Sequence, residues 1–339
     1  MDVENVPVNK EKIMKQELLY LSRKDVESVG LSISEVTEAV ESGFVEMGNG
    51  RVEMPPKPGI HPGEGGNNFI HAMPAYIPAM ASAGIKWVGG FPGNQAKGLP
   101  YITGLLILND PDTGIPKAVM DCTWITAMRT GAASAVSAKY LARPESAVIG
   151  ILACGVQGHT HLEAMNALFP LTAVRAFDIN PDQSRKLADF AHHRLGLAVT
   201  VVDDPRKAVS GCDIVVTSGP ILKEPHATIK AGWLDAGVFV SCVDFDSYFS
   251  REALNEADKW TTDNRVQYRH YQTELGFFKN CPEVYAELGE LVTGRKPGRE
   301  TPGEKNFAAN LGLAMEDMTV APLLYQRAAE KQIGTWLPL

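Results

Sequence analysis

The chain has 339 residues, of which 45% are hydrophobic and 21% charged, proportions typical of a globular protein with one or two substantial cores. Its net charge is −8, and no run of Lys and Arg is interleaved with aromatic residues, so the sequence argues against a nucleic-acid or anionic-membrane surface. The 5 cysteines are scattered without zinc-like spacing, which predicts reduced core thiols and no metal site. With no apolar signal segment and no window of about 20 apolar residues, we expect a cytoplasmic protein.

The first predicted elements are a short strand and an amphipathic helix. Residues 18–21 are typical of a strand. Ser32 and Glu35 form a capping box at the start of a helix whose apolar residues recur at helical spacing until Gly48. We expect this apolar stripe to lie in the core.

Two regions of different composition follow. Residues 51–116 are rich in Pro and Gly around short apolar runs, which predicts a mostly antiparallel or mixed sheet with long, site-bearing connections. Residues 123–142 predict an Ala-rich helix that allows another backbone to approach closely. Beyond residue 146, strands alternate with helices. The expected strands are 147–152, 174–178, 198–202, 213–217 and 238–242, the expected helices are 156–168, 183–195 and 205–209, and 307–331 is typical of a long C-terminal helix.

This alternation predicts an α/β fold with a Rossmann-type doubly wound parallel sheet. We expect that domain to span residues 126–306. Residues 1–125, joined by residues 307–339, would form a second, α+β domain.

The stretch Ile151-Leu-Ala-Cys-Gly-Val-Gln-Gly158 has the context of a dinucleotide-binding turn, because it follows a strand and opens a helix. Gly155 stands where the backbone must approach phosphate, and Gly158 where the helix meets the strand. Ala153 replaces the first glycine of the usual fingerprint, which is compatible with the turn if its φ is negative. A plain strand-to-helix junction is the alternative, but the complete pattern favours a cofactor.

An acid at the end of the next strand, Asp178, completes this pattern. Its charge favours the ribose hydroxyls of NAD and repels the 2′-phosphate of NADP, although Arg185 nearby leaves the preference open. The predicted cofactor is therefore NAD. The predicted cofactor-binding residues are Gly155, Val156, Gln157, Gly158, Asp178, Thr217 and Ser218.

Over almost its whole length the chain resembles the ornithine cyclodeaminase/mu-crystallin family. The matching stretches are residues 73–75, 86–94, 112–116, 126–130, 155–157 and 316–317. The resemblance implies a homodimer in which the N-terminal domain and the C-terminal helix supply dimer contacts and substrate groups. It also implies that the middle domain binds NAD(P).

Chemistry on an amino or imino acid needs a cationic clamp for the carboxylate and an acid or base near the nitrogen. Arg51 and Arg129 look like the family's two substrate-carboxylate arginines, although a structural ion pair is the alternative for Arg129. Lys86 lies in the apolar run Ala83-Gly-Ile-Lys-Trp-Val88, where burial would lower its pKa towards that of a general acid or base; a solvated edge-strand lysine is the alternative.

Three further positions remain open to interpretation. Asp246 looks like the family's catalytic aspartate, and Asp244 competes for that role. His71 stands where ornithine cyclodeaminases carry an acid that holds the distal amine of the substrate, although it also fits a packed strand residue. Lys57 and His61, in a Pro-rich loop, either reach the site or are simply solvated.

The sequence thus predicts an NAD(H)-dependent enzyme that transfers a hydride at the α carbon of a small amino or imino acid. It leaves open whether the net reaction is oxidation, reduction or cyclodeamination. The alternatives are an ornithine cyclodeaminase that recycles NAD and a non-catalytic, mu-crystallin-like binding protein.

Overall fold

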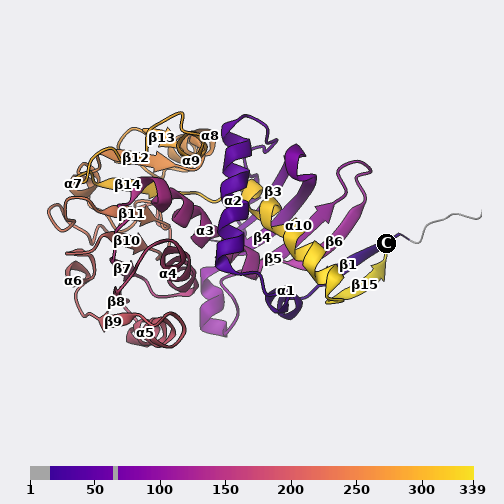
Figure 1. Cartoon of the computed structure of the whole chain (residues 1–339), viewed down its shortest axis with the longest axis horizontal. Helices are drawn as coiled ribbons and strands as arrows, with labels where there is room; N and C mark the ends of the chain where they lie inside the picture. The colour runs from indigo at the N-terminus through magenta and orange to yellow at the C-terminus, as the bar shows by residue number, and fades with distance from the viewer. Residues whose placement is uncertain (1–15, 64–67) are drawn as a thin grey trace, which may run out of the picture.

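A computed structural model describes residues 16–63 and 68–339 of the chain. Within these residues the structure has a seven-stranded and an eight-stranded sheet. Figure 1 shows the two sheets on opposite sides of the molecule, with helix α2 (Ile33–Gly48) running between them. The predicted two-sheet α/β architecture is confirmed.

The smaller sheet is mixed: its strands pair antiparallel except for β1 and β6, which are parallel. In sheet order its strands are β15 (Thr335–Pro338), β1 (Glu17–Leu21), β6 (Pro116–Asp121), β5 (Ile102–Asn109), β4 (Ser82–Gly90), β3 (Phe69–Ile77) and β2 (Gly59–Ile60). Two short 3-10 helices, η1 (Pro78–Met80) and η2 (Pro92–Lys97), lie in its connections.

Helices α1 (Arg23–Val29), α2 and α10 (Ala314–Glu330) belong to the same domain as this sheet. Helix α10 packs on β3, β4 and β5 and crosses the front of the sheet in Figure 1. The expected capping box of α2 is present: the backbone N–H of Ser32 donates to the Glu35 carboxylate, and the N–H of Glu35 donates to the Ser32 hydroxyl. The apolar stripe of α2 is buried, as predicted.

The larger sheet is entirely parallel. Its strands are, in sheet order, β13 (Ala286–Glu287), β12 (Lys259–Thr262), β14 (Asn306–Ala309), β11 (Phe239–Cys242), β10 (Ile214–Thr217), β7 (Val148–Leu152), β8 (Ala173–Phe177) and β9 (Ala198–Val201). Its helices are α4 (Val156–Leu168), α5 (Pro181–Leu195), α6 (Pro205–Val209), α7 (Arg251–Leu254), α8 (Arg265–Thr273) and α9 (Leu288–Val292). The chain order reverses between β7 and β10, which creates the crevice where such folds bind ligands.

Helix α3 (Thr123–Leu141) connects the two domains and is buried along most of its length. It packs against α2 on one side and α4 on the other. A Cβ atom on Gly131 would lie 2.8 Å from the carbonyl oxygen of Thr160 in α4, so the predicted close approach of two backbones occurs here. Helix α3 thus contacts both α4 and strand β5 of the smaller sheet.

The point at which the chain passes back from the larger to the smaller domain differs from the prediction. Residues 307–331 were expected to form one helix outside the Rossmann domain, but Phe307 to Ala309 lie in β14 between β11 and β12. The return therefore follows Ala309, and α10 begins only at Ala314. The apolar residues of this stretch are as compatible with a buried parallel strand as with a helix.

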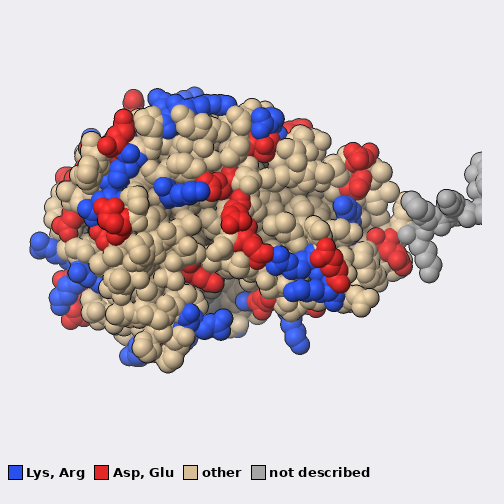
Figure 2. Space-filling view, in the orientation of Figure 1, with Lys and Arg blue, Asp and Glu red and all other residues tan. Residues whose placement is uncertain are grey.

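The described surface carries charges of both signs. On the face seen in Figure 2, Lys and Arg side chains are interspersed with Asp and Glu, without one extended basic area. No helix in the described parts of the chain is long and apolar enough to cross a membrane. All five cysteines are free thiols, and four of them are buried.

Candidate active site between the two sheets

The turn between β7 and α4 leaves the N-terminus of the helix open. Gly155 is the N-cap of α4 and supplies no side chain to its free amides. A Cβ atom on Gly155 would meet no atom within 4 Å, so the turn is open on that side. On Gly158 it would lie 2.8 Å from the Ala153 carbonyl oxygen, because helix and strand pack closely there. These features fit a dinucleotide phosphate at the helix N-terminus.

Ala153 departs from the sequence-based expectation. A negative φ was expected for an alanine at this position, but its φ is +69°, in the left-handed region that favours glycine. The conformation is fixed by its surroundings. Its N–H donates to the Phe177 carbonyl at 2.9 Å, and its carbonyl accepts the Ser218 hydroxyl at 2.8 Å. The turn therefore keeps the glycine-type geometry although the residue is alanine.

Asp178 stands at the end of β8, as predicted. Its carboxylate accepts the N–H of Cys154 at 2.7 Å and the N–H of Asn180 at 2.8 Å, which orients it beside the turn. Arg185 is paired with Asp182, so its charge is already compensated. A cleft opens next to Asp178 at the ends of β8 and β9; it is lined by Phe177, Asp178, Ile179, Pro181, Ser184, Thr200, Val201, Val202, Asp203 and Lys207.

The hydroxyls of Thr217 and Ser218 both donate hydrogen bonds within the protein. The Thr217 hydroxyl is fully buried and donates to Asp244 at 2.7 Å. Ser218 donates to the Ala153 carbonyl. Val156 and Gln157 lie on the first turn of α4, where the Val156 side chain is exposed.

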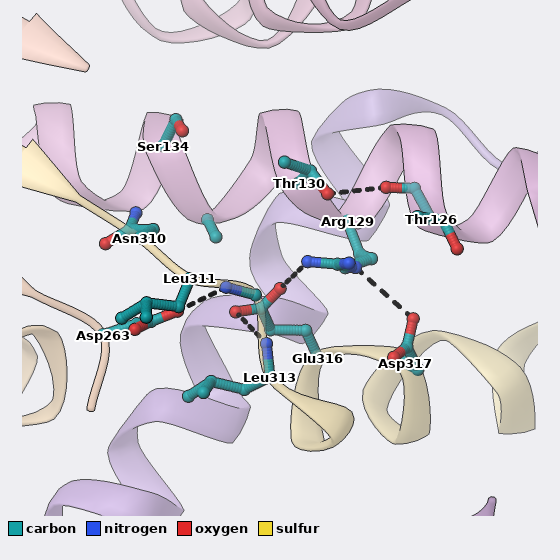
Figure 3. Close-up of polar contacts among 12 residues, drawn as sticks. Thr126, Arg129, Thr130, Ser134, Asp263, Asn310, Leu311, Leu313, Glu316 and Asp317 are labelled. Carbon is teal, nitrogen blue, oxygen red and sulfur yellow. Dashed lines mark hydrogen bonds and ion pairs between the residues drawn. The ribbon is translucent and has the colours of Figure 1, made fainter. Parts of the chain in front are cut away.

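A buried cluster of charges lies where α3, α10 and β4 meet. The ammonium of Lys86 is 2.7 Å from the Asp317 carboxylate and 3.3 Å from the Thr126 hydroxyl. Arg129 reaches the first turn of α10, with Nη1 2.7 Å from Glu316 and Nε 3.4 Å from Asp317. Figure 3 shows this guanidinium extending from α3 towards both carboxylates. The structure thus brings two predicted site residues, Lys86 and Arg129, together through Asp317.

Lys86 is not an edge-strand lysine. Strand β4 lies inside the sheet, and Lys86 pairs with Met73 and Leu106 on the face that α10 covers. The side chain is fully buried, and its burial together with the charge of Arg129 lowers its pKa. Arg129 is only 7% exposed; burial opposes its charge, but Glu316 and Asp317 outweigh burial and raise its pKa.

Lys57, which the sequence left open, is a member of the same site. Its ammonium donates to the carbonyls of Leu311 at 3.0 Å and Gly312 at 3.2 Å. The N–H of Gly312 in turn donates to the buried carboxylate of Asp263 at 2.7 Å. Burial lowers the pKa of Lys57 to about 8 and raises that of Asp263 to about 7. A Pro-rich loop gives no sequence signal for the direction of such a side chain.

Arg51 is not brought into this cluster. It lies just beyond α2, half exposed, and both its Nε and Nη2 donate to the carboxylate of Glu46, at 2.6 and 2.7 Å. Lys57 and Lys86 are the other two cations near Arg129. The expected pairing of Arg51 with Arg129 does not occur in this structure.

His71 lies on the cluster side of the smaller sheet. It is two residues from Met73, the partner of Lys86, and therefore shares its face. Its ring stacks on Phe69 and contacts His61 edge-on. Burial, with Lys57 and His61 nearby, lowers its pKa to about 3, so it is a neutral imidazole near pH 7.

The two aspartates after β11 have different surroundings. Both oxygens of Asp244 are occupied, one by the Thr217 hydroxyl and the other by the N–H of Gly219, and burial raises its pKa to about 7. Asp246 is also buried, which raises its pKa, but its Oδ1 has no hydrogen-bond partner among the described residues. Asp246 thus has one carboxylate oxygen without a donor among the described residues, whereas each oxygen of Asp244 already accepts a hydrogen bond.

Comparison with known proteins identifies the family. A model of the ornithine cyclodeaminase/mu-crystallin family matches residues 16–332. The chain belongs to this family. Alanine dehydrogenase of Archaeoglobus fulgidus is 36% identical over 326 residues, which cover 94% of this chain and 98% of that protein.

Two solved structures of the family superimpose closely. One is the Δ1-pyrroline-2-carboxylate reductase of Thermococcus litoralis in complex with NADH and L-proline, with 35% identity, a TM-score of 0.86, and 94% of this chain and 99% of that chain covered. The other is an archaeal alanine dehydrogenase dimer with bound NAD, with 34% identity, a TM-score of 0.84, and coverage of 95% and 99%. The predicted family is confirmed, and the cofactor in both relatives is the predicted NAD(H).

Within residues 16–63 and 68–339, no group of three or more His, Cys, Asp or Glu side chains is arranged to hold a metal ion.

Proposed function

We propose that this protein is an NAD(H)-dependent oxidoreductase acting at the α carbon of a small amino or imino acid. The observation that carries the proposal is the placement of Arg129: its helix, α3, packs against the helix that opens at the dinucleotide turn, while its guanidinium enters the buried ionic cluster. The proposed carboxylate-binding cation is thus carried by a helix that contacts the proposed cofactor-binding helix. The relatives described above act on substrates of this class.

The charge balance of the cluster suits a carboxylate substrate. The cluster contains three cations, Lys57, Lys86 and Arg129, and three carboxyl groups, Asp263, Glu316 and Asp317. Because burial raises the pKa of Asp263 to about 7, part of its negative charge is lost at neutral pH. The pKa of Lys57 is lowered to about 8, so this lysine keeps most of its charge near pH 7 and, together with Arg129, can attract an anion. We assign the substrate carboxylate to Arg129, with Lys57 as the second cation.

Lys86 and Asp246 are proposed as the acid–base groups. Lys86 uses two of its three N–H donors on Asp317 and Thr126, which leaves one for a substrate atom. Asp246 has a free carboxylate oxygen after β11, at the end of the sheet where parallel α/β folds place their ligands. We therefore assign the catalytic aspartate to Asp246. NAD(H), held by the turn at Gly155 and by Asp178, supplies the hydride acceptor or donor.

A homodimer is proposed from the uncovered face of the smaller sheet. Trp87 and Leu105 pair across β4 and β5 on the face opposite Lys86 and are 50% and 44% exposed. Tyr76 on β3 and Ile60 on β2 are also exposed apolar residues. Exposed apolar residues grouped on one face of a sheet are typical of an interface. The relative solved as a dimer supports a second copy of this chain as the partner. The cytoplasmic location expected from the sequence stays a prediction.

The direct test follows NADH absorbance. The protein is incubated with NAD and single amino acids, and then with NADH and imino acids, or with 2-oxo acids plus ammonia. We expect turnover with at least one α-amino or imino acid. Lys86→Met should lower turnover by roughly two to three orders of magnitude, with NADH binding retained, because it removes a general acid or base. The absence of NAD(H)-linked turnover across a full panel of these substrates would contradict the proposal.

A further inference from the structure

The carboxylate of Asp317 is shared between two cations that the proposed mechanism uses. It lies 2.7 Å from the ammonium of Lys86 and 3.4 Å from Nε of Arg129. The Lys86 and Asp317 side chains are both fully buried. The other hydrogen-bond partner of Lys86 among the described residues is the neutral hydroxyl of Thr126. Asp317 is thus the negative charge in direct contact with this lysine.

The preceding residue, Glu316, contacts only one of these cations. Its Oε2 is 2.7 Å from Nη1 of Arg129, and its Oε1 accepts the N–H of Leu313 at 3.1 Å. Figure 3 shows both carboxylates on the first turn of α10, one on each side of the guanidinium. Two adjacent acids therefore have separable contacts: Glu316 with Arg129, and Asp317 with Lys86 as well.

We propose that Asp317 is a positioning residue that keeps Lys86 protonated and oriented for catalysis, whereas Glu316 orients Arg129 for substrate binding. This inference rests on the proposed function, in which Lys86 is an acid–base group. Asp317 acts through Lys86 and is not itself assigned a contact with substrate.

Electrostatics explains why such a residue is needed. A buried lysine tends to release its proton because burial disfavours the charged form. The positive charge of Arg129 acts in the same direction, and Asp317 opposes both. The other titratable groups near Lys86 are Cys122 before α3 and His71 on β3. Burial raises the pKa of Cys122 to about 11 and lowers that of His71 to about 3, so neither carries charge near pH 7.

The test is the pH dependence of kcat in the direction of imine reduction. It uses NADH and the imino acid that gives the highest turnover in the substrate panel described under the proposed function. In this direction Lys86 acts as an acid, so activity declines as pH rises through its pKa. Asp317→Asn should move this alkaline limb to lower pH by about one to three units, the usual effect of removing one close opposite charge. It should also lower kcat at neutral pH by roughly tenfold or more, with a smaller change in KM. Lys86→Met should abolish the limb.

Two matched variants separate positioning from general stabilisation. Glu316→Gln should raise KM by roughly tenfold and leave the alkaline limb in place. Glu35→Gln removes an ion pair between α2 and Arg327 near the other end of α10 and should leave both parameters unchanged. NADH binding, followed by fluorescence, should be retained in every variant. This measurement confirms that each protein is folded.

An alkaline limb in Asp317→Asn that superimposes on wild type, while Lys86→Met abolishes it, would overturn the positioning role and leave the proposed function intact. Unchanged activity in Lys86→Met would instead contradict the role of Lys86 itself. If Asp317→Asn does not fold, Asp317→Glu decides. It keeps the charge, so the limb should remain, but the displaced lysine should lower kcat by roughly tenfold. An unchanged kcat in Asp317→Glu would then refute the proposal.

Discussion

The ammonium of Lys57 donates a hydrogen bond to the carbonyl of Gly312, so a loop of the smaller domain is fastened to the segment that returns from the larger one. The same glycine donates its N–H to Asp263, which follows β12 of the larger sheet. The contact places a cation from the Pro-rich loop beside Arg129. The sequence had assigned the second carboxylate-binding cation to Arg51 and had left the direction of Lys57 open.

The first prediction distinguishes these two cations. Lys57→Met should raise KM for the amino or imino acid by roughly tenfold to a hundredfold, the scale of losing one charged hydrogen bond to a carboxylate. Arg51→Met should leave KM unchanged, because Arg51 is paired with Glu46 at the surface. Steady-state kinetics of the two variants measure the difference. The opposite ranking would assign binding of the substrate carboxylate to Arg51 instead of Lys57.

The second prediction is a preference for NAD(H) over NADP(H). Asp178 faces the cleft at the ends of β8 and β9, and Asp203 adds a second carboxylate there, already paired with Lys207. Repulsion of the 2′-phosphate should cost about 1 to 3 kcal/mol, or roughly tenfold to a hundredfold in KM. Asp178→Ser should reduce this preference. Equal KM values for the two cofactors in the wild type would argue against it.

The regular half of the fold was readable from the sequence because strand and helix alternate without interruption between residues 146 and 217. Beyond β11 the sequence pattern no longer predicted the strands correctly. Strand β12 was not recognised, and β14 was assigned to a helix, because short buried parallel strands have no period of their own. Family resemblance supplied Lys86 and Arg129. It did not supply the direction of Lys57, which depends on contacts with residues more than 250 positions away.

The left-handed backbone conformation of Ala153 could not be predicted from the sequence either. It leads to the third prediction. A left-handed conformation costs a non-glycine residue about 1 to 2 kcal/mol in the folded state. A glycine relieves this strain, but its greater chain entropy stabilises the unfolded state by about 0.4 to 1 kcal/mol. Ala153→Gly should therefore raise the free energy of unfolding by about 0.5 to 1 kcal/mol. Denaturant unfolding of the variant and wild type checks this. A destabilised variant would indicate that the Ala153 methyl group makes compensating contacts.

The fourth prediction concerns ornithine. His71 is neutral near pH 7, and Lys57 lies close enough to lower its pKa. A neutral imidazole cannot form an ion pair with the second ammonium group of ornithine, as a carboxylate would. We expect ornithine to be used less efficiently than amino or imino acids with apolar, neutral polar or acidic side chains. His71→Glu should raise the relative efficiency for ornithine. Efficient conversion of ornithine to proline and ammonia with catalytic NAD would instead identify a cyclodeaminase.

The fifth prediction tests the homodimer. Trp87→Glu combined with Leu105→Glu places two charges on the uncovered face of the smaller sheet and should produce a monomer in sedimentation equilibrium. Leu168→Glu is the matched control, because Leu168 is an exposed apolar residue on α4 of the other domain. The control should keep the wild-type mass. A wild-type protein that is already monomeric at micromolar concentration would rule out this interface.

The long separation in sequence between Lys86 and Asp317, 231 residues, has a consequence for protein synthesis. A chain emerges from the ribosome starting at its N-terminus, and its domains begin to fold in that order. Lys86 and Arg129 therefore leave the ribosome long before the carboxylates with which they pair. The ionic cluster therefore cannot form until Asp317 in α10 has been synthesised, 231 residues after Lys86. Until then the lysine and the arginine have to be accommodated without their carboxylate partners.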